Sequence, residues 1–160
     1  MTDLLRYQDP LVIQRVLHSA RTIAIVGLSP NELRASYFVG YYLQRHEYRI
    51  IPVNPRESQI LSQPCYPSLS DVPEPVDIVN VFRAPAAVPG IAREAVAAGA
   101  GSLWCQFGVI SEEGAAIAEE GGLTVVMDRC LKVEHARYVG RMHWLGFNTH
   151  QITSVRSGLQ

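Results

Sequence analysis

A chain of 160 residues with 48% hydrophobic and 18% charged side chains is expected to fold as a globular protein rather than remain disordered. Its formal net charge of −1 provides no basic field for a polyanion, so nucleic acid is not expected as a partner. No apolar run approaches the roughly 20 residues that span a bilayer, and no signal peptide is recognisable. We therefore expect a cytoplasmic protein with no membrane partner. Residues 1–160 are predicted to form a single domain, with a core at about 9–140 and a tail at 141–160.

Five short apolar runs, separated by helical stretches, predict a parallel β-sheet that is buried on both faces. The predicted strands are, in chain order, Thr22–Leu28, Tyr48–Val53, Val76–Phe82, Ser102–Phe107 and Leu123–Met127. Right-handed crossovers then favour a Rossmann-like three-layer α/β sandwich with a five-stranded parallel sheet in the order 3-2-1-4-5. In such a sheet a ligand binds outside the carboxyl ends of the strands, here at a switch point between the first and fourth strands.

Capping residues and helical periodicity predict helices around these strands, with Ser36 and Ser111 as N-caps. The connection Pro55–Pro75 is too rich in proline for a long helix, so we expect a short extended piece and one helical turn there. The predicted helices are, in chain order, Pro10–Ala20, Ser36–Glu47, a helix from Pro85 or Pro89 to Gly99, a helix from Ser111 to Gly121, and Cys130–Arg141.

The residues after the first predicted strand form a candidate anion site. Gly27 allows a ligand to approach the backbone closely, and the N–H groups at the start of the helix at Ser36 can donate to a phosphate. The dinucleotide fingerprint G-x-G-x-x-G is missing, because Ser29 and Glu32 occupy the second and third glycine positions.

The second predicted strand leads into Asn54, Pro55 and Arg56. An NAD-binding domain places an acidic residue at this point to accept hydrogen bonds from the ribose hydroxyls. An arginine without an acid suits instead an adenosine whose ribose carries a phosphate. Coenzyme A and NADP both satisfy that requirement, so the electrostatics alone do not choose between them.

Ordered motifs over about Asp9–Tyr138 resemble one protein family. The motifs are IAIVGLSP with a following S-Y, IIPVNP, YPSLSDVPEPVDIVNVFR, LWCQFGV and VVMDRCLKVEHARY. Together they are similar to the stand-alone CoA-binding proteins related to the nucleotide-binding domain of the succinyl-CoA synthetase α subunit. The resemblance implies binding of coenzyme A or acyl-CoA, without an assigned reaction.

The resemblance also implies cofactor-binding residues after each of the first four strands. The residues expected to line the phosphates are Gly27, Leu28, Ser29, Pro30, Ser36, Tyr37 and Val39. Those expected around the adenosine end are Asn54, Pro55 and Arg56. Those expected to flank the nucleotide are Phe82, Arg83 and Pro85. Those expected to face the pantetheine are Gln106, Phe107 and Gly108.

The three cysteines are far apart in sequence and are expected to be reduced thiols. Cys65 and Cys105 are predicted to be small packed residues. Cys130 follows the last predicted strand at the ligand edge, so we count it among the cofactor-binding residues and expect it near the thiol end of coenzyme A. No cysteine or histidine pair has the spacing of metal ligands, and no metal is predicted.

Three classes of function are compatible with these features. The first is a CoA-binding carrier or sensor without catalytic activity, with a homodimer or an unidentified protein partner left open. The second is an NADP-linked oxidoreductase, against which count the missing fingerprint and the lack of a Tyr-x-x-x-Lys pair. The third, a purely structural interaction domain, leaves the strand-end residues without a shared purpose. Ligase chemistry is not expected, because no histidine lies in the glycine-rich motif of a phosphorylated histidine.

Overall fold

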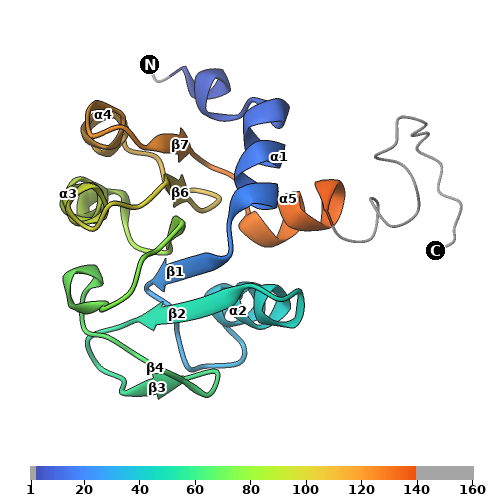
Figure 1. Ribbon diagram of the computed structural model, residues 1–160, viewed down its shortest axis with the longest axis vertical. Coiled ribbons are helices and arrows are strands. Elements are labelled where there is room, and N and C mark those ends of the chain that lie inside the picture. The colour runs from blue at the N-terminus through green and yellow to red at the C-terminus, as the bar shows by residue number, and fades with distance from the viewer. Residues whose placement is uncertain (1–2, 140–160) are drawn as a thin grey trace, which may run out of the picture.

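The computed structural model describes residues 3–139, and within them five parallel strands form one sheet with helices on both faces (Figure 1). The expectations for the tail at 141–160 lie outside the described residues. The sheet strands are β1 (Thr22–Val26), β2 (Arg49–Val53), β5 (Ile78–Val81), β6 (Ser102–Cys105) and β7 (Thr124–Val126). The predicted α/β class and the five-stranded parallel sheet are confirmed.

The order of the strands is β2-β1-β5-β6-β7, so the predicted order 3-2-1-4-5 is wrong. The third long strand of the chain, β5, pairs with β1 instead of β2. The outer edge of β2 is already occupied at its carboxyl end, because Tyr66 donates its N–H to the carbonyl of Pro52 and accepts from the N–H of Asn54. At the other end, the carboxylate of Asp77 accepts from the N–H and hydroxyl of Thr22, which holds β5 beside β1. The switch point therefore lies between β1 and β5.

The predicted helices all form, with small shifts at their ends. The helices are α1 (Pro10–Ser19), α2 (Ala35–Arg45), α3 (Val88–Ala97), α4 (Glu112–Glu120) and α5 (Leu131–Tyr138), and the 3-10 turns are η1 (Leu4–Tyr7), η2 (Leu69–Asp71) and η3 (Pro85–Ala87). Ser111 caps α4 as predicted, since its side chain accepts from the N–H of Gly114. Ser36 is not the N-cap of α2, because that position is occupied by Arg34. The Ser36 hydroxyl instead accepts from the N–H of Ser29.

The connection between β2 and β5 contains a hairpin of two short strands, β3 (Gln59–Ile60) and β4 (Gln63–Pro64), followed by the turn η2. This agrees with the predicted short extended piece and single helical turn. The hairpin lies beside β2 at one end of the sheet (Figure 1).

Alternate side chains of each strand enter two separate cores, one on each face of the sheet. Ile23 and Ile25 of β1 pack with Trp104 under α1, α2 and α5. Ala24 and Val26 pack under α3 and α4. This division gives the three layers of the sandwich (Figure 1).

The amino-terminal segment contacts Met127, the residue that directly follows β7. The carbonyl of Tyr7 accepts from the N–H of Met127 at 3.3 Å, and the Gln8 amide donates to the Met127 carbonyl at 3.1 Å. Within residues 3–139, no helix is long and apolar enough to cross a membrane.

Candidate functional site

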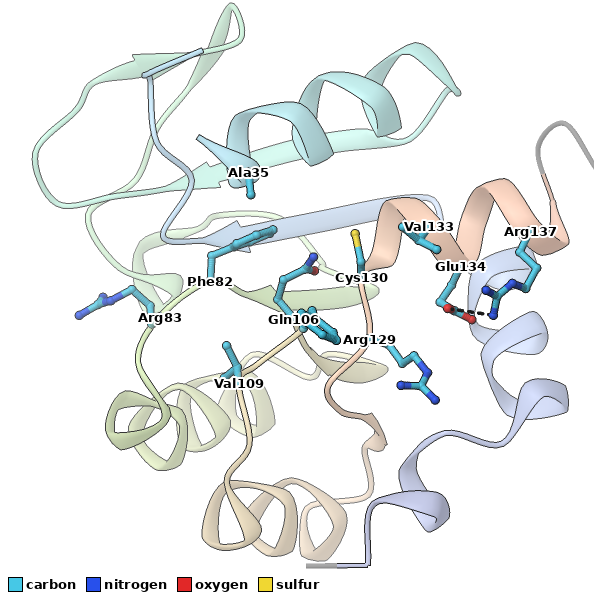
Figure 2. Close-up of a pocket in the computed structure, with 11 residues that line it drawn as sticks. Ala35, Phe82, Arg83, Gln106, Val109, Arg129, Cys130, Val133, Glu134 and Arg137 are labelled. Carbon is cyan, nitrogen blue, oxygen red and sulfur yellow. Dashed lines mark hydrogen bonds and ion pairs between the residues drawn. The ribbon is translucent and has the colours of Figure 1, made fainter. Parts of the chain in front are cut away.

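Two adjoining clefts open at the carboxyl edge of the sheet. The smaller cleft, about 600 Å³, lies between the loops that follow β1, β2 and β5 and the start of α2. The larger cleft, about 850 Å³, lies between the loops that follow β5, β6 and β7 and the side of α5 (Figure 2). Ala35, Phe82 and Arg83 line both clefts, so together they form one continuous binding surface.

Gly27 lets the loop after β1 meet the loop after β5 at the switch point. Its φ of +96° is a conformation that side-chain-bearing residues rarely adopt, and a Cβ there would lie 2.5 Å from the carbonyl oxygen of Phe82. Its N–H donates to the carbonyl of Val53 at 2.9 Å, which extends the sheet by one bond. The backbone of Gly27 is thus exposed to the smaller cleft, and only glycine fits between the two loops.

Side-chain hydrogen bonds hold the loops around the smaller cleft in place. The Ser36 hydroxyl accepts from the N–H of Ser29 at 3.0 Å. The Asn54 amide donates to the carbonyl of Leu28 at 2.9 Å, and its oxygen accepts from the N–H of Arg56 at 2.8 Å. Ser36 and Asn54 therefore position the loops that any ligand of this cleft would touch.

Three guanidinium groups, those of Arg34, Arg56 and Arg83, line the smaller cleft. All three residues are exposed, and none forms an ion pair with another residue in the described part of the chain. The N–H groups of Ala35 and Ser36, at the start of α2, likewise have no hydrogen-bond acceptor within residues 3–139. Positive charge and free donors at a helix N-terminus are features that favour an anion in this cleft.

The larger cleft has a mostly apolar wall, formed by Phe82, Phe107, Val109 and Val133. Phe107 is 73% exposed, which is unusual for an aromatic ring with no polar atom. An extended ligand with apolar segments would cover this ring and remove it from water.

Polar groups occupy defined places in the larger cleft. Gln106, which is 6% exposed, accepts through Oε1 from the N–H of Leu131 at 3.4 Å. At the opposite end from Arg83, Figure 2 shows Arg129, Glu134 and Arg137 together. The buried Glu134 carboxylate accepts from Arg137 at 3.5 Å, so its charge is compensated.

Most of the predicted site residues come together in these two clefts. Those that line the smaller cleft are Gly27, Ser29, Ser36, Asn54, Pro55, Arg56, Phe82 and Arg83. Those that line the larger cleft are Phe82, Arg83, Gln106, Phe107 and Cys130.

Other predicted site residues line neither cleft: Leu28, Pro30, Tyr37, Val39, Pro85 and Gly108. The side chains of Leu28 and Val39 point inward, into the core under α2. Tyr37 stacks on Tyr41 of the same helix, with ring centroids 6.4 Å apart. Gly108 donates its N–H to the carboxylate of Asp128 at 2.7 Å.

Sequence reasoning missed residues at the start of α2, in the loops after β6 and β7, and along α5. The missed lining residues are Arg34, Ala35, Val109, Arg129, Val133, Glu134 and Arg137. A signal was present for α5, because Cys130, Val133, Glu134 and Arg137 recur at the spacings of three and four that share one helix face. No comparable pattern indicated Arg34, because the expected N-cap of α2 was Ser36 and Arg34 lay before it.

Among residues 3–139, no group of three or more histidine, cysteine or acidic side chains is arranged to hold a metal ion.

The sequence that forms this fold and these clefts matches a known family of domains. Residues 21–136 match the family model of the CoA-binding domain named CoA_binding_2, so the chain is a member of this family of CoA-binding domains. The resemblance inferred from the ordered motifs is thereby confirmed.

Individual proteins resemble this chain in sequence or in fold. The uncharacterized protein YneT of Bacillus subtilis is 41% identical over 124 residues, which cover 78% of this chain and 92% of YneT. Acetate–CoA ligase (ADP-forming) I of Archaeoglobus fulgidus is 26% identical over 121 residues, 69% of this chain but only 18% of the ligase. A hypothetical protein from Pyrococcus horikoshii superposes with a TM-score of 0.81 at 33% identity, covering 86% of this chain and 96% of that one.

Proposed function

We propose that this protein binds coenzyme A, free or acylated, along the two clefts, and that it acts as a carrier or sensor without catalytic activity of its own. The observation that carries the proposal is the pairing of two unlike surfaces. Three arginines that have no ion-pair partner within residues 3–139 and a helix N-terminus line the smaller cleft, which adjoins a larger, mostly apolar one.

Coenzyme A has the same division along its length. A 3′-phosphate and a pyrophosphate carry its negative charge at one end, and a neutral pantetheine arm carries the thiol at the other. Arginine is well suited to phosphate, because its planar guanidinium donates two parallel hydrogen bonds. Arg34, Arg56 and Arg83 would bind the phosphates, and the wall from Phe82 to Val133 would bind the arm.

A binding role is preferred to catalysis because of how the reactive groups in the larger cleft are placed. A nucleophilic enzyme needs its nucleophile within hydrogen-bond reach of a base. Cys130 makes no side-chain hydrogen bond to a described residue, and the charge of Glu134 is compensated by Arg137. Membership of a CoA-binding domain family supports coenzyme A as the ligand. The role as a carrier or sensor is our proposal.

A thermal-shift comparison of coenzyme A, acetyl-CoA, dephospho-CoA, NAD and NADP tests the proposed ligand. A ligand present at about 100 times its dissociation constant adds roughly 2.7 kcal/mol to the free energy of unfolding. For a domain of this size the midpoint should rise by about 5 to 10 °C. Coenzyme A should produce this shift and NAD should not.

The same experiment decides the competing function. An NADP-linked oxidoreductase would be stabilised by NADP and not by coenzyme A. A shift with NADP, combined with no shift from coenzyme A up to the same concentration, would overturn the proposed function.

A further inference from the structure

Cys130 places a thiol in the larger cleft. It is the N-cap residue of α5, it is partly exposed, and its side chain makes no capping hydrogen bond. In the view of Figure 2, its sulfur lies between Phe82 and Val133, which line the same cleft. Cys130 therefore borders the space assigned to the pantetheine arm.

A second observation at the same place points to a ligand. The Gln106 side chain is 6% exposed and its Oε1 accepts from Asn80 Nδ2 and Leu131 N–H, at 3.3 and 3.4 Å. Its Nε2 donates to no acceptor in residues 3–139, although the side chain lines the cleft. A nearly buried amide with an unused donor is ready for a ligand carbonyl, and the pantetheine arm carries two amide carbonyls.

The position of Gln106 also indicates where the thiol end of that ligand would lie. The residue whose N–H it accepts, Leu131, directly follows Cys130 in the chain. An amide of the arm bound at Gln106 would thus leave the arm's terminal thiol close to Cys130.

The other two cysteines are not comparable, since neither lines the cleft. Cys105 is wholly buried in β6, and this burial raises the pKa of its thiol to about 12. Burial also raises the pKa of Cys65, whose Sγ donates to the carbonyl of Asn54 at 3.5 Å. Neither thiol is placed or ionised for exchange at neutral pH.

We propose that Cys130 exchanges with the terminal sulfur of the bound cofactor, so that coenzyme A disulfide converts it to a Cys130–CoA mixed disulfide. The inference rests on the proposed function, because it needs the nucleotide end bound in the smaller cleft. The Cys130 thiolate attacks the sulfur of the bound half and forms a new S–S bond. The other half leaves as the CoA thiolate and takes up the proton that Cys130 lost.

The exchange conserves one disulfide and one thiol, so no outside oxidant is consumed. A free thiol such as glutathione reverses the reaction by attacking the mixed disulfide. The cleft would thereby retain coenzyme A covalently whenever the ratio of disulfide to thiol is high.

The test treats the reduced protein with coenzyme A disulfide and follows it by intact-mass and peptide analysis. We expect one CoA adduct, located on Cys130 and removed by dithiothreitol. The initial rate should be at least tenfold higher than with glutathione disulfide at equal concentration, because binding of the nucleotide concentrates the reacting sulfur. Cys130→Ser should abolish the adduct, whereas the matched control Cys65→Ala should form it at the wild-type rate.

Three results would overturn the inference: no adduct, an adduct only on Cys65 or Cys105, or equal rates with the two disulfides. The comparison of rates uses the wild-type chain, so it holds even if the serine variant does not fold. Calorimetry of reduced coenzyme A with the wild-type protein separates the two proposals. Binding without an adduct refutes the exchange alone, and absence of binding refutes the proposed function itself.

Discussion

Gly27 and Phe82 lie so close together that a single added methyl group on the glycine would be 2.5 Å from the phenylalanine carbonyl oxygen. The contact joins the loops on the two sides of the switch point. It also explains why the smaller and larger clefts share a wall, since Phe82 lines both.

Gly27→Val is therefore expected to abolish CoA binding and to lower the free energy of unfolding. The clash and the positive φ should together cost about 2–5 kcal/mol. Urea denaturation measures the stability, and calorimetry with circular dichroism measures binding by the folded fraction. Gly90→Ala is the matched control, because a Cβ at Gly90 meets nothing within 4 Å. A folded valine variant with unaltered affinity would show that the site lies elsewhere.

Arg56→Ala is expected to weaken CoA binding by about tenfold, roughly 1.4 kcal/mol, through the loss of a charge-assisted phosphate contact. If Arg56 binds the 3′-phosphate, the variant should bind coenzyme A and dephospho-CoA almost equally. Arg34→Ala, beside the start of α2, should weaken both ligands alike. Calorimetry with the two ligands gives the comparison.

The control for these variants is Arg93→Ala, whose exposed side chain lies 4.0 Å from Glu113 and outside both clefts. It should bind both ligands like the wild type. If the Arg56→Ala variant keeps the full preference for coenzyme A over dephospho-CoA, Arg56 does not bind the 3′-phosphate.

Asn54→Ala is expected to destabilise the fold by about 1–3 kcal/mol, because it leaves the Leu28 carbonyl and the Arg56 N–H without their partner. Asn54→Asp keeps the acceptor for Arg56 and should lose less stability. Urea denaturation of the three proteins tests this order. An alanine variant of normal stability that no longer binds coenzyme A would instead mean that Asn54 contacts the ligand directly.

The pH dependence of stability should report on His135. Burial lowers the pKa of this histidine to about 4, and His46 and His18 add to the effect. The Tyr42 hydroxyl lies 3.0 Å from its Nδ1. The unfolded chain takes up a proton near pH 6.5, while the folded chain does so only near pH 4, so stability is lost as the pH falls through that window.

His135→Phe should remove this loss. Between pH 7 and pH 5 the wild type should lose about 2 kcal/mol more of its free energy of unfolding than the variant does. Urea denaturation at the two pH values provides the measurement. Parallel pH profiles would show that His135 titrates normally in the folded protein.

The elements of this fold were predictable because their signals are local. Apolar runs marked the five strands, and Ser111 with Gly121 marked both ends of α4. The strand order was not predictable, because it depends on a long-range contact: Tyr66 occupies the edge of β2 that the next strand would need. No pattern in the residues around Tyr66 predicts that bridge.

The residues of the candidate site can likewise be divided into those that local signals predict and those that depend on packing. Residues that directly follow a strand, such as Arg56 and Gln106, were predictable because parallel strands end at a common edge. Leu28 and Val39 were assigned by resemblance alone, and the pleat and the helix turn their side chains into the core. Arg137 was missed because only the packing of α5 beside the sheet brings its helix face to the cleft.

The chain's own backbone meets the sheet at both of its edges, since Tyr66 pairs with the carboxyl end of β2 and Tyr7 accepts from Met127, which directly follows β7. An exposed edge strand offers unpaired N–H and carbonyl groups on which another chain can build a continuous ladder. Here that route is blocked at the carboxyl end of β2, where Tyr66 already takes up the Pro52 carbonyl and the Asn54 N–H. A second copy or a partner protein docking at this corner would have to use side chains rather than backbone groups.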